Sequence, residues 1–403
     1  MSLIDLVREA AGSVRDPELR RSLGELGMVG DVTVEGTNAT VEVRLTIVGC
    51  PAAASIEHDV RTAVAAVAGI GDVTMHMQVM TPEQRAELLT ALRPGGAKTN
   101  PFGPGTLTRV IAVPSGKGGV GKSSVTANLA AELAKQGYRV GILDADVYGF
   151  SIPALMGLVT DGVAAKPTRL DDMIVPPVGH DVKVISIGMF VENANAAVAW
   201  RGPMLQRTIT QFLTDVYFGD LDFLLLDLPP GTGDIAITVG QQLPNSEVLV
   251  VTTGQAAASE VAVRAGVLAQ QTGQKLLGVV ENMGPLTLPD GSTLELFGSG
   301  GGEDVARELG TNRDYLSRAI SSQNTHFNEL INKYRIEEAV QILGNKCDKR
   351  NNFSLSIIAS DVGFKTMSVF IEAFRKQTGM NPAQFRATAC NEEKEGNNLP
   401  IIV

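Results

Sequence analysis

The segment GKGGVGKSS, residues 116–124, combines four glycines with two lysines and two serines. Such a loop lets backbone N–H groups converge on phosphate oxygens, because no Cβ atom stands in the way. Lys122 is placed to reach the β- and γ-phosphates of a nucleotide, and the Ser123 hydroxyl suits Mg²⁺. The sequence therefore predicts an ATP- and magnesium-binding loop made of Gly116, Lys117, Gly118, Gly119, Val120, Gly121, Lys122, Ser123 and Ser124.

Acidic and amide side chains stand where three other apolar runs end. The residues are Asp144 and Asp146 in GILDADVYGF, Asp227 in FLLLDLPPGTGD and Asn282 in GVVENM. Carboxylates beside a bound nucleotide can organise Mg²⁺ and the attacking water. A single such aspartate is as often a helix cap or a turn residue. Their order after the glycine-rich loop favours one common site.

Short apolar runs must position these residues. They are RVIAVPS, RVGILDAD, VKVISIG, DFLLLDLP, EVLVVTT and KLLGVVENM, and helical patterns separate most of them. Such runs are typical of parallel strands covered on both faces, and ligands bind these sheets at the carboxyl ends of the strands. We therefore predict a parallel, doubly wound α/β domain, a P-loop NTPase, over residues 107–310.

The rest of the 403-residue chain is organised differently. The patterns indicate a small α/β domain over residues 1–95, a linker at 96–106, an all-α region over 311–386 and a flexible tail at 387–403. The net charge is −10, but the last 93 residues carry 12 Lys or Arg against 10 Asp or Glu. The acidic first part gives no reason to expect nucleic acid, whereas the slightly basic last part permits it.

Composition excludes two further classes of protein. No apolar run approaches the roughly 20 residues of a membrane-spanning helix, and the polar-faced start MSLIDLVREAAGS is not a signal peptide. The three cysteines, Cys50, Cys347 and Cys390, are too few and too far apart for a disulfide framework. We expect a cytoplasmic protein with no membrane partner.

The early lysine of the loop, Lys117, makes GKGGVGKS resemble the deviant Walker A motif of the MinD/ParA-like ATPases. The resemblance implies an ATP-sandwiched homodimer in which Lys117 reaches the nucleotide of the opposing subunit, as an arginine finger does. Lys117, Lys122 and Asp146 are then the catalytic residues, with Asp146 positioning the water. The resemblance also implies Mg²⁺ contacts from Ser123, Asp144 and Asp227, and adenine recognition by Asn282.

The phrases DADVYGFSIP, WRGPM, LDLPPGTGD and GVVENM, in this order, resemble the Mrp/ApbC iron–sulfur cluster carrier proteins over residues 107–310. VRDPEL and LTIVGCP resemble the iron–sulfur assembly domain that is often fused to them. This resemblance implies slow Mg²⁺-dependent ATP hydrolysis and delivery of an iron–sulfur cluster to apoprotein clients.

The chain departs from this family in three places. The family commonly carries a Cys-x-x-Cys pair after ENM that holds a [4Fe–4S] cluster in the dimer, whereas this chain has no cysteine there. Gly254 and Phe150 stand where Pro is usual, and at Gly254 we expect mainly a change in stiffness. Cys50 remains open between two interpretations. It is either an iron–sulfur ligand with a pKa lowered by a helix start, or a small buried apolar side chain.

From Thr311 onward the sequence resembles the AraC/XylS-type DNA-binding region, which has two helix-turn-helix units. In the second unit SLSIIASDV and KTMSVFIEAFRKQTG flank the turn residue Gly363. The residues expected to face inward are Ile357, Ile358, Val362, Val369, Phe370 and Phe374. The candidate contacts to duplex DNA are Arg313, Lys365, Thr366, Ser368 and Arg375.

The stretch EDVARELG, residues 303–310, fits both neighbours. It can close the NTPase domain or open the first helix-turn-helix unit, but one helix cannot bury the same face against two cores. The strand that usually completes the NTPase sheet does not follow, so we expect a truncated sheet. A natural fusion, a recombined gene and an engineered join all agree with this seam.

Two functions compete. The first is an ATP-hydrolysing iron–sulfur cluster carrier, and the alternative is an AraC-like, sequence-specific transcription regulator in which the ATPase is a sensor or a dimerisation module. A third interpretation is an inactive chain that aggregates through an exposed strand edge. The NTPase motifs cover more of the chain, which favours the first function.

Overall fold

A computed structural model describes residues 2–93, 99–147, 149–190, 202–288, 292–310, 327–344, 353–364 and 366–391. The chain divides into two compact units, Met1–Arg313 and Asp314–Val403. Within the described ranges, no helix is both long and apolar enough to span a bilayer. Two of the candidate DNA contacts, Arg313 and Lys365, lie outside these ranges, as does most of the expected tail.

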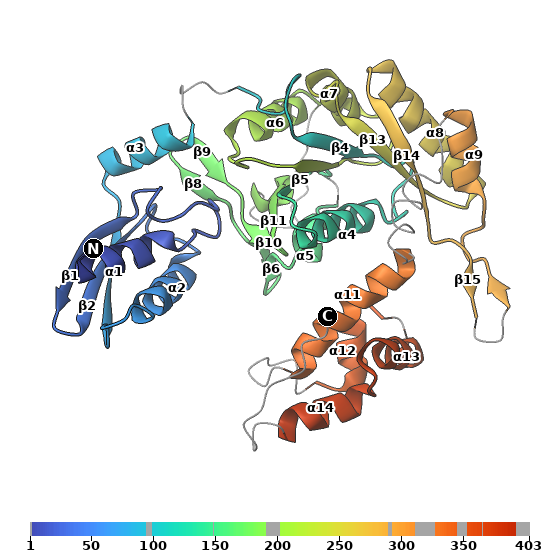
Figure 1. The fold of residues 1–403 in the computed structure, drawn as a ribbon. Coiled ribbons are helices and arrows are strands. Elements are labelled where there is room, and N and C mark those ends of the chain that lie inside the picture. The colour runs from blue at the N-terminus through green and yellow to red at the C-terminus, as the bar shows by residue number, and fades with distance from the viewer. Residues whose placement is uncertain are drawn as a thin grey trace. The chain divides into compact units, whose positions relative to one another are not determined.

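The first unit begins with a small α/β domain, coloured blue in Figure 1. Its elements are α1 (Leu3–Ser13), β1 (Val29–Glu35), β2 (Asn38–Leu45), α2 (Ala53–Ala65), β3 (Val73–Val79) and α3 (Pro82–Leu92). β2 pairs antiparallel with β1 and parallel with β3. Exposed or half-buried residues alternate with buried ones along β2, so one face of this sheet forms the core beneath α1 and α2.

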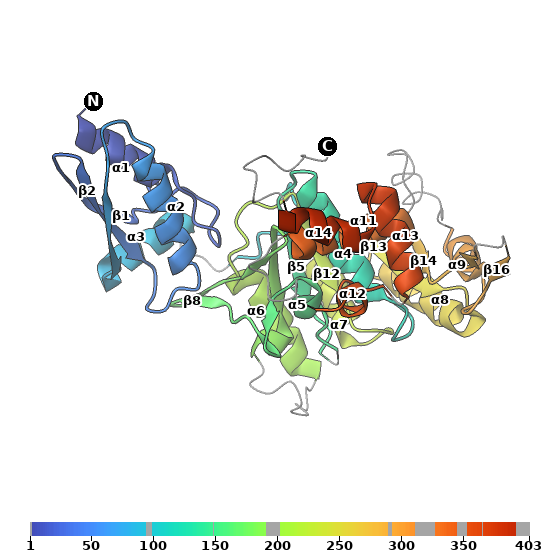
Figure 2. The ribbon, with the colours of Figure 1, turned by 90° about the horizontal axis from the view of Figure 1, so that it is seen from below.

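Residues from a distant part of the chain complete this core. The hairpin of β8 (Thr168–Leu170) and β9 (Met173–Val175) contributes Leu170, Met173 and Val175 to the buried cluster of the small domain. Figures 1 and 2 both place β8 beside that domain. A segment of the following domain therefore completes the buried core of the small domain.

A seven-stranded sheet forms the centre of the second domain, in the order β10-β11-β5-β12-β4-β13-β14. The strands are β4 (Arg109–Val113), β5 (Val140–Asp144), β10 (Val178–Gly179), β11 (Val182–Ser186), β12 (Phe223–Asp227), β13 (Glu247–Thr253) and β14 (Lys275–Asn282). All of the pairings are parallel except that of β10 with β11. The sequence-based prediction of a parallel sheet is confirmed.

Helices cover both faces of this sheet, as Figure 1 shows. Along β12, Leu224 and Leu226 join the cluster that contains α6 (Gly202–Asp215), α7 (Asp234–Gln242), α8 (Ala256–Gln271) and α9 (Gly301–Glu308). Leu225 joins the opposite cluster with α4 (Lys122–Lys135) and α5 (Ile152–Leu155). Because successive strand residues point to opposite faces, an uninterrupted apolar run serves both layers, and the predicted doubly wound architecture is confirmed.

The last strand of the sheet order, β14, has a described strand neighbour on one side only. A small hairpin of β15 (Leu286–Thr287) and β16 (Thr293–Leu294) follows it, and then α9. Val305, Ala306 and Leu309 of the seam stretch are buried in the core of the NTPase domain. The helix of the seam stretch, α9, thus packs in the NTPase domain. Its apolar face is buried there and cannot also form the core of a helix-turn-helix unit.

The second unit contains α11 (Phe327–Gly344), α12 (Leu355–Asp361), α13 (Met367–Thr378) and α14 (Pro382–Asn391) among its described residues. Four of the expected inward-facing residues are buried in its core: Ile358, Val362, Phe370 and Phe374. The prediction was wrong for Ile357, which is 52% exposed, and for Val369, which is 50% exposed. Each directly precedes a buried residue on its helix, and a step of one position turns a side chain by about 100°.

Candidate nucleotide site

The glycine-rich loop joins the end of β4 to the start of α4 in the middle of the sheet. Gly119 and Gly121 have φ values of 81° and 84°, a left-handed conformation that favours glycine. A Cβ atom on Gly116 would lie 2.3 Å from the backbone nitrogen of Ala262, and one on Gly121 would lie 2.2 Å from Asn282 Nδ2. Glycine is thus required here for backbone conformation and for close packing.

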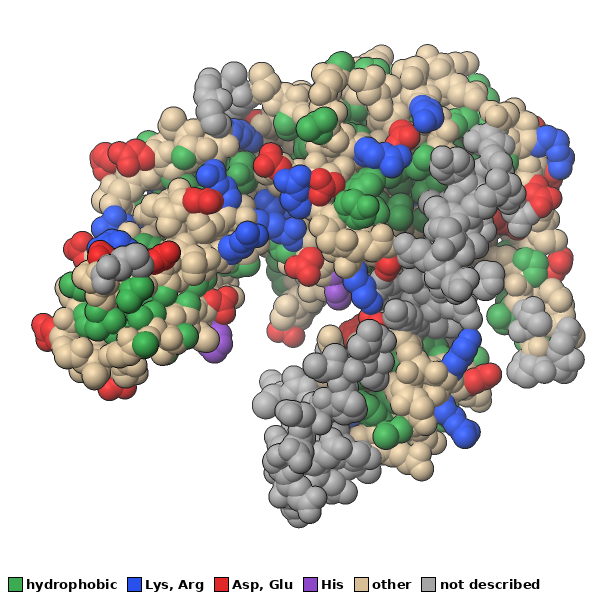
Figure 3. All heavy atoms as spheres, viewed as in Figure 1, with side chains coloured by type: hydrophobic (Ala, Val, Ile, Leu, Met, Phe, Trp, Pro, Cys, Tyr) green, Lys and Arg blue, Asp and Glu red, His purple; other side chains and the backbone are tan. Residues whose placement is uncertain are grey.

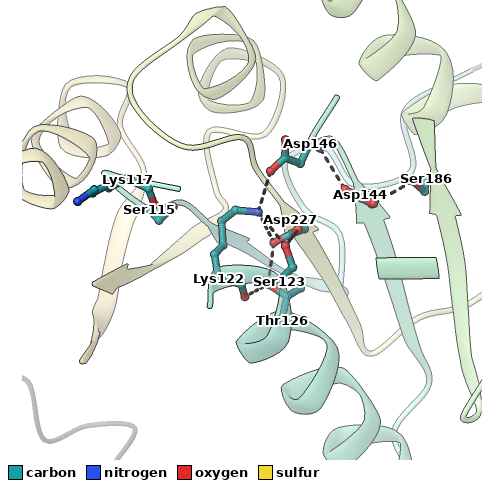
Figure 4. A network of polar contacts seen from close by, with 9 residues as sticks. All are labelled: Ser115, Lys117, Lys122, Ser123, Thr126, Asp144, Asp146, Ser186 and Asp227. Atoms are coloured by element: carbon teal, nitrogen blue, oxygen red, sulfur yellow. Dashed lines mark hydrogen bonds and ion pairs between the residues drawn. The ribbon is translucent and has the colours of Figure 1, made fainter. Parts of the chain in front are cut away.

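Lys122 and Ser123 meet Asp227 at the carboxyl end of β12 (Figure 4). Lys122 Nζ lies 2.7 Å from Asp227 Oδ1, and Ser123 Oγ donates to Asp227 Oδ2 at 2.6 Å. Thr126, one helical turn further along α4, donates to Asp227 Oδ1 at 3.1 Å. Asp227 is fully buried. Burial raises the pKa of this carboxyl, and the Lys122 charge and these hydrogen bonds oppose the rise.

Asp146 and Asp144 follow the neighbouring strand, β5, and take different positions. Asp146 Oδ2 lies 3.6 Å from Lys122 Nζ, on the side of the glycine-rich loop. The Asp144 carboxyl instead accepts the backbone N–H of Asp146 at 3.1 Å and the Ser186 hydroxyl at 2.8 Å. Burial, reinforced by the Asp227 charge, raises the pKa of Asp144 to about 8. Of the two carboxylates, Asp146 is the one that contacts the P-loop lysine.

Lys117 is exposed, and its side chain points away from Lys122 in Figure 4. The Ser115 hydroxyl donates to the Lys117 carbonyl at 3.1 Å and so ties the loop backbone down beneath it. The exposed Lys117 ammonium group is compatible with the prediction that it contacts the nucleotide of a second subunit. Its reach to a nucleotide stays a prediction.

Asn282 and Glu281 end β14 on the other side of the loop. Asn282 Nδ2 donates to the carbonyl of Val120 at 2.9 Å, so this side chain contacts the phosphate-binding loop itself. Glu281 accepts the backbone N–H groups of Gly300 at 3.2 Å and Gly302 at 2.6 Å. A carboxylate thus caps the positive end of α9 and fixes the strand end that carries Asn282.

Sequence reasoning missed Thr126, Ser186 and Glu281. Thr126 was detectable, because it lies one helical turn after Lys122 and shares its face. Ser186 and Glu281 end apolar runs, as the predicted aspartates do, but their partners depend on the order of strands and on the path of the glycine segment 298–302. The single sequence contains neither.

Cys50 is buried with 7% of its surface exposed. Burial raises the pKa of its thiol, and the charges of Glu18 and Asp16 raise it further. Of the two interpretations left open, this environment favours the small buried side chain, because desolvation outweighs the backbone N–H groups at the start of α2. Among the described side chains, no group of three His, Cys, Asp or Glu residues could hold a metal ion.

The glycine at position 254 lies where the backbone packs tightly, and the expected change in stiffness stays a prediction. A Cβ atom there would lie 2.4 Å from the backbone carbon and oxygen of Gly298. Phe150, the other departure from the family, lies against Gly188, where an added Cβ would be 2.5 Å from its ring. Both departures sit beside glycines that approach them closely.

Three of the candidate DNA contacts can be placed. Thr366 caps α13, because its hydroxyl accepts the N–H of Val369 at 3.5 Å. Ser368 and Arg375 are exposed on the same helix. On the first unit, the described Lys and Arg side chains are interspersed with Asp and Glu on the face seen in Figure 3.

Three family models match the chain. The NUBPL iron-transfer P-loop NTPase matches residues 106–329, the iron–sulfur cluster assembly protein residues 4–77, and the helix-turn-helix domain residues 305–388. The first and third overlap over residues 305–329. The overlap of the two family models thus starts within the seam stretch, residues 303–310.

Among individual relatives, the iron–sulfur cluster carrier protein of Mycobacterium tuberculosis is 56% identical over 307 residues, which are 75% of this chain and 79% of the relative. The iron–sulfur cluster carrier protein of Synechocystis is 39% identical over 312 residues, 77% of this chain and 85% of the relative. A solved nucleotide-binding protein in complex with ADP, from Archaeoglobus fulgidus, is 40% identical. That match covers 51% of this chain and 79% of the other, with a TM-score of 0.39.

Proposed function

Because the chain belongs to the family of iron–sulfur cluster carrier P-loop NTPases, we propose that it binds and slowly hydrolyses ATP with Mg²⁺ and delivers iron–sulfur clusters to apoproteins. One observation carries the proposal. Lys122 and Ser123, at the start of α4, meet the buried carboxylate of Asp227. A cation, a hydroxyl and a carboxylate converging beside a glycine-rich loop suit a magnesium–triphosphate.

The side chains at the site fit this ligand. Ser123 and Asp227 offer the hard oxygen donors that Mg²⁺ prefers, and the glycine positions leave backbone N–H groups open to phosphate. Lys122 would exchange its contact with Asp227 for phosphate oxygens, and the freed carboxylate would support Mg²⁺. When bound, the metal ion would neutralise charge on the phosphates.

Hydrolysis needs a held water and a further positive charge. Asp146, which contacts Lys122 at 3.6 Å, is our candidate for holding the water. Lys117 would act in trans on the nucleotide of the second protomer in a homodimer formed through the nucleotide face, and its exposed position supports this role. Asn282 contacts the loop at Val120, and from there we propose that it reads adenine.

Binding of radiolabelled ATP with Mg²⁺ tests the nucleotide part. We expect Lys122→Ala to weaken binding by about tenfold or more, since charge-assisted hydrogen bonds are lost. The matched control is Lys135→Ala, at the exposed far end of the same helix, which should bind like wild type. Circular dichroism shows whether each variant is folded. Equal, negligible binding by wild type and Lys122→Ala would end the proposal.

The cluster is the cargo, and the chain offers few ligands for it. The sequence has three cysteines and no Cys-x-x-Cys pair. We propose Cys50 as a transfer ligand that must become exposed before it can act, because it is buried. Anaerobic reconstitution followed by visible absorption tests this. Cys50→Ala should lose the signal and Cys347→Ala should keep it, whereas an absent signal in wild type would remove cluster binding from the proposal.

Duplex DNA is the second candidate ligand, for one reason. A helix-turn-helix family model matches residues 305–388, and Ser368 and Arg375 are exposed on α13. Fluorescence anisotropy with labelled duplex DNA should show binding that weakens steeply with salt, and Arg375→Ala should reduce it. No binding at low salt would exclude this function.

A further inference from the structure

Ser186 ends β11 beside the candidate nucleotide site, and the proposed function leaves it without a role. It is fully buried. Across the sheet it is in register with Asp144, which is in register with Asp227. Three polar strand ends therefore lie side by side, with Asp144 in the middle and Ser186 farthest from the loop.

Ser186 accepts one hydrogen bond and donates another. The backbone N–H of Gly188 donates to Ser186 Oγ at 3.1 Å. The Ser186 hydroxyl in turn donates to Asp144 Oδ2 at 2.8 Å. Gly188 is held in turn by the Phe150 ring packed against it.

Asp144 connects Ser186 to the part of the site that lies beside the glycine-rich loop. Its carboxyl is fully buried, so protein donors rather than bulk water must set its orientation. Oδ1 accepts the backbone N–H of Asp146 at 3.1 Å, and the Asp146 side chain lies 3.6 Å from Lys122 Nζ. A continuous series of contacts runs from β11 to the P-loop lysine (Figure 4).

We propose that Ser186 is a positioning residue for ATP hydrolysis. Its hydroxyl orients the Asp144 carboxyl, which fixes the backbone at Asp146 and holds that side chain beside Lys122. The inference rests on the proposed ATPase function and names a component of it that lies outside the glycine-rich loop. In this proposal Ser186 acts through Asp144 and not on the nucleotide directly.

Steady-state turnover and equilibrium ATP binding separate positioning from folding. Ser186→Ala should lower kcat by about 10–100-fold, because a misplaced catalytic group costs rate. ATP affinity should change by less than about threefold, since Lys122 and the loop remain. Ser186→Thr keeps the hydroxyl and should retain most of the turnover.

Ser246→Ala is the matched control. Ser246 is 1% exposed, donates to the Leu243 carbonyl at 2.7 Å and accepts from Gln274 at 2.6 Å. It lies next to the start of β13, at the opposite end of the sheet. This variant should lose comparable hydrogen bonding and keep its kcat.

Amide hydrogen exchange of the nucleotide-free protein gives a readout that needs no activity. Ser186→Ala should accelerate exchange at the Asp146 N–H by about tenfold or more, since its acceptor is no longer held in place. Ser246→Ala should leave that amide unchanged.

Two results would overturn the inference. They are equal kcat in Ser186→Ala and Ser246→Ala, or an Asp146 amide that exchanges in Ser186→Ala as it does in wild type. A wild-type protein that does not hydrolyse ATP would refute the proposed function, and with it the catalytic part of this inference. The exchange experiment would still decide whether Ser186 holds Asp146.

Discussion

Asp227 has no exposed surface, and it accepts hydrogen bonds from Ser123 and Thr126 while the Lys122 ammonium lies against it. Two opposite charges taken out of water attract strongly but lose hydration, so the intact pair adds little net stability. Removing one member leaves the other buried without a partner. The folded, nucleotide-free protein is thus sensitive to either residue.

Asp227→Asn should lower the free energy of unfolding by about 3–5 kcal/mol, because Lys122 loses its buried counter-ion. Urea unfolding measures this. In the control, Asp222→Asn, the lost carboxylate pairs with Arg139 at the surface, and the cost should stay below about 1 kcal/mol. Equal costs in the two variants would mean that water reaches the Asp227 pair.

Glu18 gives the first unit a pH dependence. It is 9% exposed and accepts the Thr168 hydroxyl at 3.1 Å. Burial raises its pKa to about 7, and the Asp16 charge adds to the rise. Lys183, buried nearby, has a pKa lowered to about 8 by burial and by Arg20. The contact between the small domain and β11 thus contains two groups that titrate near neutral pH.

The raised pKa of Glu18 determines how the free energy of unfolding changes with pH. Between pH 4.5 and 7 the folded protein keeps the Glu18 proton and the unfolded chain has lost it, so stability falls as pH rises. Glu18→Gln should remove a part of this fall on the order of 1–3 kcal/mol. Urea unfolding of both proteins across this pH range checks it. A slope unchanged by the substitution would contradict the raised pKa.

Single residues of the site could be predicted from the sequence where they belong to a local motif. Lys122, Ser123 and Asp227 were named by the loop and by a strand end, and they lie in contact. Cys50 stayed open between two interpretations, because its burial depends on packing that a local sequence pattern does not show. Ile357 and Val369 were misassigned because an apolar side chain next to a buried one can still face water.

At the scale of elements, β13 and the glycine segment before α9 approach each other at Gly254 and Gly298. Their backbones come so close that no Cβ fits at position 254. Tight backbone packing of this kind depends on how a later loop returns to the sheet. The resemblance suggested an effect on stiffness, and the geometry adds a steric effect that the sequence did not show.

Gly254→Pro, which restores the residue usual in the family, should destabilise the protein by about 1–3 kcal/mol through overpacking. That cost exceeds the gain of about 0.4–1 kcal/mol expected from a stiffer unfolded chain. Thermal unfolding measures the balance, and Gly231→Ala, where an added Cβ meets nothing within 4 Å but φ is +91°, serves as a backbone-strain control. A rise in the unfolding temperature of Gly254→Pro would show that the glycine segment yields.

At the scale of the whole molecule, the seam stretch belongs to the NTPase core through Val305, Ala306 and Leu309. The two helix layers were predictable from apolar runs, because a strand buried on both faces has few polar positions, whereas the order of the strands was not. The separation of the chain near Arg313 agrees with the change of sequence character at Thr311. The exact domain limits stay predictions.

The contacts described above for the candidate nucleotide site all involve residues of the first unit, so we expect a chain of residues 1–313 to bind Mg²⁺–ATP with the affinity of the full chain, within about threefold. Isothermal titration of the two proteins tests this. A large loss in the shorter chain would mean that the second unit takes part in binding or supports β14.

The hairpin of β8 and β9 places Leu170, Met173 and Val175 in the core of the small domain, and this has a consequence during synthesis. About 80 residues separate the end of α3 from the end of β9. A ribosome adds about 5–20 residues per second, so the nascent small domain waits roughly 4–16 seconds for its last apolar partners. A gene cut after α3 would keep every newly made copy at that unfinished stage.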